Sequence, residues 1–348
     1  MKRHPPHILV LYDLPEKTSG HDVADYLLKH TERPTERDVC HTIKKLGFQL
    51  SICGVFDDVS EITRAINDKS PDLIFNLCET FLGDRAYEGH VAGLVEMCGV
   101  PMTGSKVGAL AICKDKAITK KILSFDGIRV PEFQVLSQYS NDTPNLKTYP
   151  AIVKPLNKEA SEGIAQASVV YDIKSCAERI SYIHEKLNTD AIVEEFIHGR
   201  EIYVAVIEID GEPQALTPRE LFMRELADNQ VMVATYQAKW NNSYRKKWGI
   251  KTGKHRSLDA KTLAKLKADS VCIFKSLGLT GYARMDWRLD ESGEPVFLEA
   301  NPNPALASDD DLAQSAKLSG ISYHELILKI ISAAYVSDAT NQVKLSLG

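Results

Sequence analysis

Residues 1–105 alternate short apolar runs with amphipathic segments, and no other feature restricts the fold of the chain as strongly. The apolar runs are continuous, which is typical of strands buried on both faces of a sheet. The predicted strands cover residues 7–12, 48–55 and 72–77, and the predicted helices cover residues 36–46, 61–70 and 88–98. Strands that alternate with helices predict a parallel sheet with helices on both faces.

In such a sheet, ligands bind beyond the carboxyl ends of the strands. Those ends fall at Asp13, at Asp57 and at Asn76–Glu79. No G-x-G-x-x-G motif follows the first strand, which argues against a dinucleotide site there. Residues 15–35 are polar and lack a clear period, so they predict an insertion or a mobile loop.

The bulk properties indicate a soluble protein of two or three domains. A chain of 348 residues exceeds one typical domain, and 44% hydrophobic with 26% charged residues is ordinary for a globular protein. The net charge of −5 gives no general attraction to nucleic acid or membranes, and the apolar runs are too short to span a bilayer. Seven cysteines without a C-x-x-C pair predict neither a disulfide framework nor a zinc site. With no cleavage-site pattern at the N-terminus, we expect a cytoplasmic protein.

A second constraint lies near the C-terminus, in GYARMDWRLDESGEPVFLEANPNP. Arg284 and Asp286 alternate along one predicted strand, Glu299 and Asn301 stand two apart on the next, and DESGEP predicts the turn between them. Pairing of the two strands would gather these four side chains on one surface. Two carboxylates and an amide oxygen suit Mg²⁺ that also binds phosphate oxygens. An edge hairpin with a solvated charged face explains the same pattern equally well.

The middle of the chain offers weaker signals of anion binding. Residues 109–124 predict a lysine-rich helix, and a solvated basic face explains three of its four lysines. Lys154 closes a predicted strand, 151–155, where it either points towards an anion or protects a sheet edge. The loop at 157–163 has small residues that suit phosphate, but an ordinary hairpin loop is the better prediction.

Two further segments suit a nucleotide and a lid. Residues 191–197 and 201–209 predict strands joined by a turn, where backbone groups can bind an adenine edge and Glu201 a ribose hydroxyl; a hairpin with exposed acids is the alternative. Residues 217–258 lack clean periodicity, which is unusual in a compact domain unless the segment is a lid or a binding loop. Helices are predicted at 258–277 and 323–335.

Five co-linear segments together resemble the ATP-grasp superfamily, specifically its D-alanine–D-alanine ligase-like branch. They are FNLCETFLGDRAYEGHVAGLVEMCGVPMTGS (75–105), CKDKAITKKIL (113–123), YPAIVKP (149–155), AIVEEFIHGREIYVAVI (191–207) and GYARMDWRLDESGEPVFLEANPNP (281–304). The resemblance implies an α/β protein with an N-terminal doubly wound parallel-sheet domain, followed by two α+β domains that clasp ATP. The implied divisions are 1–105, 106–188, 189–340 and a tail at 341–348.

The family's roles carry over by position. Lys116 and Lys154 would hold the ATP phosphates, Arg284 would stabilise charge at the reacting groups, and Ser161, in the segment matching the family's phosphate loop, is a candidate catalytic residue. Glu194 would contact the adenine amino group, and Glu201 would bind the ribose. The strand beside the base would be Glu195, Phe196 and Ile197. The metal ligands would be Asp286, Glu299 and Asn301, holding two Mg²⁺ (or Mn²⁺) ions.

The chain departs from the family where the substrates bind. Glu36 is the nearest match to the glutamate that binds the first substrate's ammonium group. Lys239-Trp240 replaces the usual Lys-Tyr of the large loop, and Ala305 replaces a glycine. Asp310 lies where a hydroxyl normally receives the second substrate's carboxylate. Acids there would repel a carboxylate and favour a cation, or would merely cap the following helix.

These observations predict an ATP- and Mg²⁺-dependent carboxylate–amine ligase that forms a dipeptide-like amide between amino acids through an acyl phosphate. One alternative is an authentic D-alanine–D-alanine ligase of cell-wall synthesis. An alternative of another class is a nucleotide-binding regulator without turnover. The expected partners are amino acids or dipeptide-like molecules, with no nucleic acid and no membrane, and the resemblance allows a homodimer.

Overall fold

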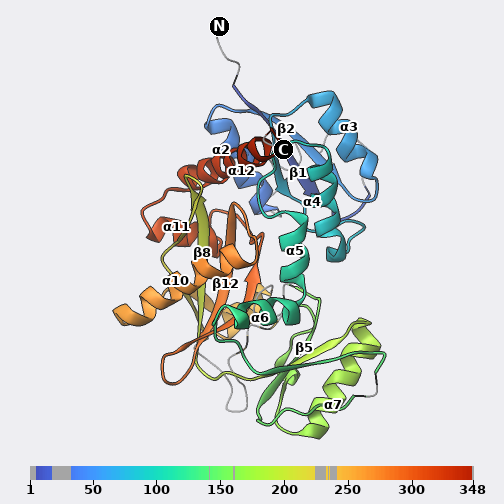
Figure 1. Ribbon diagram of the computed structural model, residues 1–348, viewed down its shortest axis with the longest axis vertical. Helices are drawn as coiled ribbons and strands as arrows, with labels where there is room; N and C mark the ends of the chain where they lie inside the picture. Colours follow the sequence, from blue (N-terminus) through green and yellow to red (C-terminus); the bar gives the residue numbers. More distant parts are fainter. Residues whose placement is uncertain are drawn as a thin grey trace.

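The computed structural model of the chain contains three sheets, stacked along its long axis (Figure 1). It describes residues 5–17, 33–140, 142–159, 161–223, 233, 235 and 241–346, without the side chains of 242 and 337–346. Most of the predicted insertion at 15–35, and both Lys239 and Trp240, lie outside the described residues. No helix in the described ranges is long and apolar enough to cross a membrane.

The N-terminal sheet is parallel, with strand order β2-β1-β3, and confirms the predicted alternation. Its elements are β1 (His7–Asp13), α2 (Pro34–Lys45), β2 (Gln49–Val55), α3 (Val59–Lys69), β3 (Leu73–Leu77), the 3₁₀ turn η1 (Arg85–Tyr87) and α4 (Glu88–Met97). Alternate side chains of β1 point to opposite faces: Ile8 packs with α2, whereas Leu9 packs with α3 and α4. Both faces are therefore buried, as continuous apolar strands predict.

A four-stranded antiparallel sheet follows, with order β4-β7-β5-β6. Its elements are β4 (Phe133–Leu136), β5 (Ala151–Pro155), the 3₁₀ turn η2 (Gln166–Ser168), β6 (Val169–Val170), α7 (Ile173–Tyr182), the π-helical turn η3 (Ile183–Leu187) and β7 (Ala191–Glu195). The core between the sheet and α7 contains Val153, Cys176, Ile180 and Val193. The predicted strands at 151–155 and 191–197 are confirmed, although β7 ends at Glu195.

The third sheet is built on β8 (Arg200–Ile209) and β12 (Tyr282–Leu289), and its order is β11-β10-β8-β12-β13 with β9 paired to β8. The remaining elements are β9 (Glu212–Ala215), β10 (Arg219–Phe222), α9 (Asn242–Lys247), β11 (Lys251–Lys254), α10 (Ala260–Ser276), β13 (Pro295–Asn301), α11 (Asp311–Leu318) and α12 (Tyr323–Ser346). The predicted hairpin is confirmed, with Arg284 opposite Asn301 and Asp286 opposite Glu299. A β-bulge follows Asp286 and turns the rest of the strand relative to its partner.

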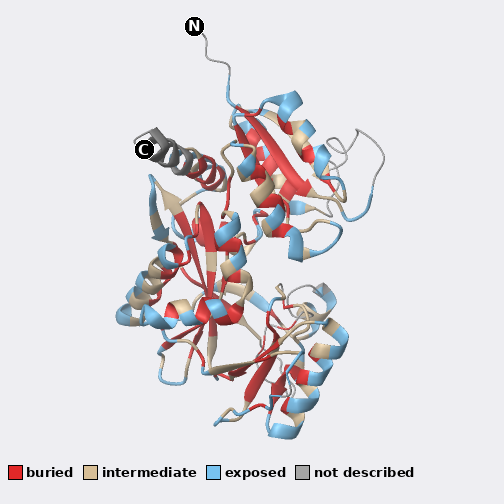
Figure 2. Cartoon of the chain, turned by 45° about the vertical axis from the view of Figure 1, so that its right-hand side comes forward, coloured by how far each residue is buried: buried red, intermediate tan, exposed pale blue. Residues whose placement is uncertain are grey.

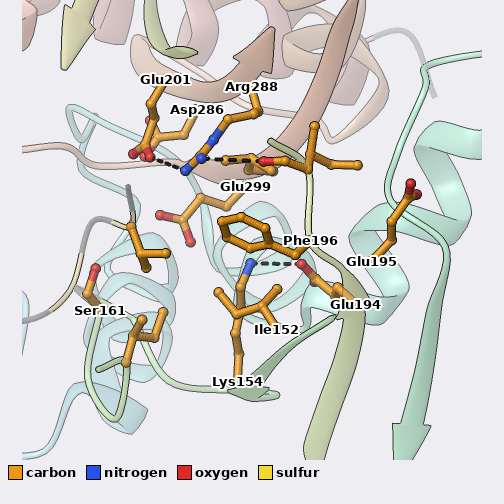
Figure 3. A pocket seen from close by; sticks show the side chains of 14 residues that line it. Ile152, Lys154, Ser161, Glu194, Glu195, Phe196, Glu201, Asp286, Arg288 and Glu299 are labelled. Carbon is orange, nitrogen blue, oxygen red and sulfur yellow. Dashed lines mark hydrogen bonds and ion pairs between the residues drawn. The ribbon is translucent and has the colours of Figure 1, made fainter. Parts of the chain in front are cut away.

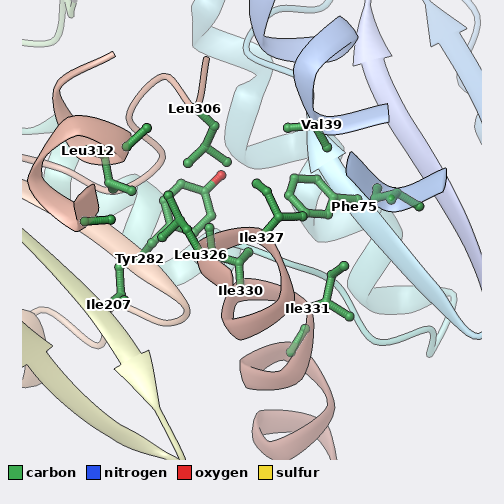
Figure 4. Close-up of a cluster of buried hydrophobic side chains, with 14 of the residues drawn as sticks. Val39, Phe75, Ile207, Tyr282, Leu306, Leu312, Leu326, Ile327, Ile330 and Ile331 are labelled. Atoms are coloured by element: carbon green, nitrogen blue, oxygen red, sulfur yellow. The ribbon is translucent and has the colours of Figure 1, made fainter. Parts of the chain in front are cut away.

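Helix α12 joins the first and third sheets through one apolar core (Figure 4). Its Ile327 and Ile331 lie in the same cluster as Phe75 of β3 and Ile207 of β8. Figure 2 shows buried residues concentrated on the strands of all three sheets, with exposed residues on the outer helix faces. The shared core fixes the carboxyl edge of the N-terminal sheet against the loop that follows β13.

The single helix predicted for residues 109–124 is wrong, because the chain forms α5 (Val107–Lys114) and α6 (Lys116–Phe125). Asp115 breaks the helix and caps α6, its carboxylate accepting hydrogen bonds from the backbone N–H groups of residues 117 and 118. The solvated basic face is also wrong for Lys120, which is 1% exposed.

Candidate active site

A pocket opens between the four-stranded and six-stranded sheets (Figure 3). Its apolar wall comprises Ile152, Ile164, Phe196, Ile197, Val233 and Leu298. Its polar lining comprises Lys154, Ser161, Glu194, Glu195, Glu201, Asp286, Arg288 and Glu299. The pocket thus brings together nine of the residues singled out from the sequence: Lys154, Ser161, Glu194, Glu195, Phe196, Ile197, Glu201, Asp286 and Glu299. An apolar slot with charged ends suits a flat base joined to an anionic tail.

Glu194 forms a buried ion pair with two lysines. Its Oε2 lies 2.7 Å from Lys154 Nζ and its Oε1 lies 2.9 Å from Lys120 Nζ. Burial would raise the pKa of Glu194, but the two lysines outweigh burial and lower it to about 2. Glu194 is therefore charged at neutral pH, and two cations share one anion beside the pocket.

Lys120 is a site residue that sequence reasoning missed. It also donates a hydrogen bond to the backbone oxygen of Leu298, at 2.8 Å, and so connects α6 and β7 to the strand that carries Glu299. One local signal was available: Lys120 stands four positions after Lys116, which places both on one face of a helix.

Lys116 is buried at the start of α6, outside the lining of the pocket. Its ammonium group donates to the backbone oxygens of Leu156, at 3.4 Å, and of Lys158. Burial lowers the pKa of Lys116. Lys116 thus holds the loop after β5, in which Ser161 has a φ of 62°, a conformation that costs free energy for a residue with a side chain.

The carboxylates of the hairpin lie at the other end of the pocket. Arg284 donates to both oxygens of Asp286, at 2.7 and 2.9 Å. The side-chain amide nitrogen of Asn301 is buried without a hydrogen-bond partner among the described residues. The nitrogen and oxygen of the Asn301 amide exchange places when the group flips, so its oxygen can occupy this buried position and act as an acceptor.

The hairpin suits metal ions that are bound partly by its side chains and partly by the oxygens of a phosphate chain. In the described ranges no group of three or more His, Cys, Asp or Glu side chains is placed to hold a metal ion. Asp286 and Glu299 supply two carboxylates, and Asn301 one amide oxygen. This donor set fits Mg²⁺, which commonly takes one or two carboxylates and completes its shell with phosphate oxygens and water.

Glu201 is held from two sides. Arg288 Nη2 lies 2.7 Å from its Oε2, and the hydroxyl group of Tyr203 donates to its Oε1 at 2.9 Å. Arg288 also donates to the backbone oxygen of Ile197 at 3.4 Å, and its guanidinium carbon lies 5.7 Å from the ring centroid of Phe196. Both partners of Glu201 were missed as site residues. Arg288 contacts it across from β12, whereas Tyr203 stands two residues further along the same strand and shares its face.

A second pocket lies beyond the carboxyl ends of β1 and β3, where the sequence predicts a ligand. It is lined by Asp13, Arg33, Thr35, Glu36, Asn76, Leu77, Cys78, Glu79, Arg85, Tyr282, Asn303, Pro304, Ala305 and Leu306. Glu36 and Ala305 therefore share a pocket, whereas Asp57 lies outside it and pairs with Lys17 at 2.8 Å. Glu36 lies 2.7 Å from Arg33, and burial raises the pKa of its carboxyl group.

Asp310 does not line either pocket. It stands at the N-cap position of α11, but its carboxylate accepts from the backbone N–H of Ala307 at 2.9 Å and makes no capping hydrogen bond to the helix. Burial raises its pKa to about 6. The next acid, Asp311, pairs with Arg219 at 2.8 Å.

Solved structures similar to this chain show the class of fold. The D-alanine–D-alanine ligase from Bacillus anthracis complexed with ATP matches with a TM-score of 0.71 at 22% identity, over 97% of this chain and 99% of that one. The VanG D-Ala:D-Ser ligase from Enterococcus faecalis matches with a TM-score of 0.69 at 20% identity, over 95% and 99%. The fold is therefore the ATP-grasp fold, as predicted.

Sequence relatives define the family. The family model described as "D-ala D-ala ligase C-terminus" matches residues 122–332. D-alanine–D-alanine ligase B of Chromobacterium violaceum is 30% identical over 286 residues, which cover 81% of this chain and 86% of that protein. The uncharacterized protein y4sG of Sinorhizobium fredii is 31% identical over 267 residues, covering 77% and 76%. The chain belongs to the D-alanine–D-alanine ligase family, and it is an ATP-grasp ligase that forms C–N bonds.

Proposed function

We propose that the protein uses ATP and Mg²⁺ to join the carboxylate of one amino acid to the amine of another through an acyl phosphate. The observation that carries this proposal is one pocket with an apolar slot between a lysine-paired Glu194 and the carboxylates Asp286 and Glu299. Adenine would occupy the slot, and a phosphate chain would lie between the lysine and the carboxylates.

Each part of the pocket has a proposed task. Phe196 and Ile197 flank the base, Glu201 binds the ribose, and Lys154 with Lys116 binds phosphate oxygens as point charges. Lys116 now donates to backbone carbonyl oxygens, and a phosphate oxygen is a stronger acceptor for the same ammonium group. Asp286, Glu299 and Asn301 would hold the Mg²⁺ ions, which neutralise charge on the nucleotide.

The reaction needs positioning more than a nucleophilic side chain. A substrate carboxylate oxygen attacks the γ-phosphorus, the bond to ADP breaks, and an acyl phosphate forms. The amine of the second substrate then attacks the acyl carbon, loses a proton and expels phosphate, which leaves an amide. Arg284, which donates hydrogen bonds to Asp286, would stabilise negative charge at the reacting groups.

The second pocket is proposed to bind the first amino acid. Glu36 offers a buried carboxylate for an ammonium group, and Arg33 and Arg85 offer cations for a carboxylate. Amino acids are favoured as substrates by the names of the relatives, which include a D-Ala:D-Ser ligase as well as D-alanine–D-alanine ligases. Because the chain departs from the family at Ala305 and Asp310, we place authentic D-alanine–D-alanine ligation second.

Phosphate release with ATP, Mg²⁺ and all pairs from a panel of D- and L-amino acids tests the proposal, with product masses as the second readout. An amide with at least one pair is expected. No amide with any pair would reject a peptide-type ligase, and ATP binding without ADP release would then favour a nucleotide-binding regulator.

A further inference from the structure

Tyr203 of β8 contacts two groups that have different tasks in the proposed nucleotide site. Its hydroxyl group donates to Glu201 Oε1 at 2.9 Å. The guanidinium carbon of Arg284 lies 4.6 Å from the centroid of its ring. Glu201 is assigned to the ribose and Arg284 to the reacting groups, so one side chain touches both parts of the site.

The sheet fixes Tyr203 in this position. Tyr203 pairs with Asp286 across to β12 and with Arg219 across to β10, so its strand has hydrogen-bonded neighbours on both sides. The side chain is 4% exposed and packs with Leu221 and Ile250. A side chain packed on this scale keeps one rotamer, and its hydroxyl group and ring therefore keep fixed directions.

The contacts of Glu201 leave it able to bind a ligand. Its Oε1 accepts from Tyr203 and its Oε2 pairs with Arg288 at 2.7 Å, which holds the carboxylate plane in place. Each carboxylate oxygen has two lone pairs, so both oxygens keep an acceptor site for a hydroxyl donor. Figure 3 shows Glu201 and Arg288 on the wall of the pocket, beside Asp286.

The ring of Tyr203 acts on Arg284 in a different way. A guanidinium group over an aromatic face is attracted by the negative face of the ring, and the attraction is stronger away from water. Arg284 is also held by its two hydrogen bonds to Asp286. The ring therefore limits the directions that Arg284 can take if Asp286 turns towards another partner.

We propose that Tyr203 is a positioning residue that connects ribose recognition to the placement of Arg284. Its hydroxyl group orients Glu201, and its ring orients Arg284. The inference rests on the proposed function, since it takes ATP as the ligand. It assigns one role to the hydroxyl group of Tyr203 and another to its ring, and different substitutions remove them.

Tyr203→Phe removes the hydroxyl group and keeps the ring. We expect its affinity for ATP to fall about tenfold, as for the loss of one hydrogen bond to a charged group. Its affinity for 2′-deoxy-ATP and 3′-deoxy-ATP should fall less, so that discrimination between ATP and the weaker deoxynucleotide decreases. Its kcat at saturating ATP should stay within about twofold of the wild type, because the ring remains over Arg284.

Tyr203→Met removes the ring face and leaves a smaller, unbranched apolar side chain. We expect it to show the same loss of discrimination and, in addition, a kcat at saturating ATP reduced about tenfold or more. Tyr244, which packs in the same apolar cluster, provides the matched control. Tyr244→Phe should leave both nucleotide discrimination and kcat unchanged.

Calorimetric titration with the three nucleotides needs no turnover, so it separates this inference from the proposed reaction. Wild-type protein that binds ATP but forms no amide would reject the reaction and leave the ribose test valid. Undiminished discrimination in Tyr203→Phe overturns the proposal, whatever the stability of Tyr203→Met. Equal kcat values for folded Tyr203→Phe and Tyr203→Met also overturn it, because the ring would then have no effect on Arg284.

Discussion

Replacing Lys120 with methionine tests whether the buried ion pair at Glu194 holds the two halves of the proposed ATP site together. Met has a similar length but no charge, so the change leaves Glu194 paired with Lys154 alone. The two lysines lower the pKa of Glu194 from 4.5 to about 2, which corresponds to about 3 kcal/mol in favour of its charged form. Loss of one partner from a buried pair typically costs about 3–5 kcal/mol of stability. Because Lys154 remains paired with Glu194, we expect a loss at the lower end of this range, about 3 kcal/mol.

The stabilisation by this ion pair should decrease at low pH. The pKa of Glu194 is lower in the folded than in the unfolded chain, so the stabilisation is complete above about pH 4.5 and decreases towards about pH 2. The difference between wild type and Lys120→Met should therefore be largest at pH 7 and should shrink as the pH falls through this range.

Urea denaturation measures the effect, with the fluorescence of the buried Trp287 on β12 as a reporter of the six-stranded sheet. Lys121→Met is the matched control, because Lys121 is the next residue on α6 and is exposed. It should change the free energy of unfolding by less than about 0.5 kcal/mol. A loss below about 1 kcal/mol in Lys120→Met would refute the argument.

Three further predictions concern the reaction and its substrates. Glu299→Gln and Arg284→Ala should each abolish phosphate release, while calorimetry should find ATP binding retained in Arg284→Ala; normal rates in either variant would remove its assigned role. Glu36→Gln should raise the KM of the first amino acid at least about tenfold and leave the KM of ATP unchanged, because it removes a buried carboxylate partner for an ammonium group. Asp310→Ser should increase kcat/KM for D-alanine as second substrate if Asp310 repels a carboxylate. Since the pKa of Asp310 is about 6, the gain should be larger at pH 8 than at pH 5, and equal gains would count against repulsion.

The hairpin was predictable from the sequence because its signal is local. Residues two apart on a strand share a face, so the alternation of Arg284 with Asp286 and of Glu299 with Asn301 gave the surface directly. The predicted turn implied that the two strands pair, and the structure places Arg284 opposite Asn301 and Asp286 opposite Glu299. The parallel N-terminal sheet was predictable for a similar reason. Each of its strands is a short apolar run and each of its helices an amphipathic segment, and both patterns are local.

The surroundings of Lys120 were not predictable in this way. Its partners are a carboxylate on β7 and a backbone oxygen 178 residues further along the chain, and no local pattern contains either of them. The break at Asp115 was hidden for the opposite reason, because apolar residues continue on both sides of it at nearly helical spacing. Arg288 was missed because its role depends on which residue of the neighbouring strand it faces. Tyr203 shares a face with Glu201 on the same strand, but its contact with Arg284 crosses to β12.

The two pockets differ in how they are built. The proposed nucleotide pocket is lined largely by paired strands. Arg288 of β12 holds Glu201 of β8, and Tyr203, which also holds Glu201, faces Asp286 across the β8–β12 register. A change at any of these positions disturbs its neighbours. The second pocket is lined partly by connections, with residues 303–306 after β13 on one side and residues 76–79, at the end of β3 and just beyond it, on the other. Side chains on connections change with less effect on a sheet. Altered residues such as Ala305 can therefore change the amino acid that binds while the machinery that activates it stays intact.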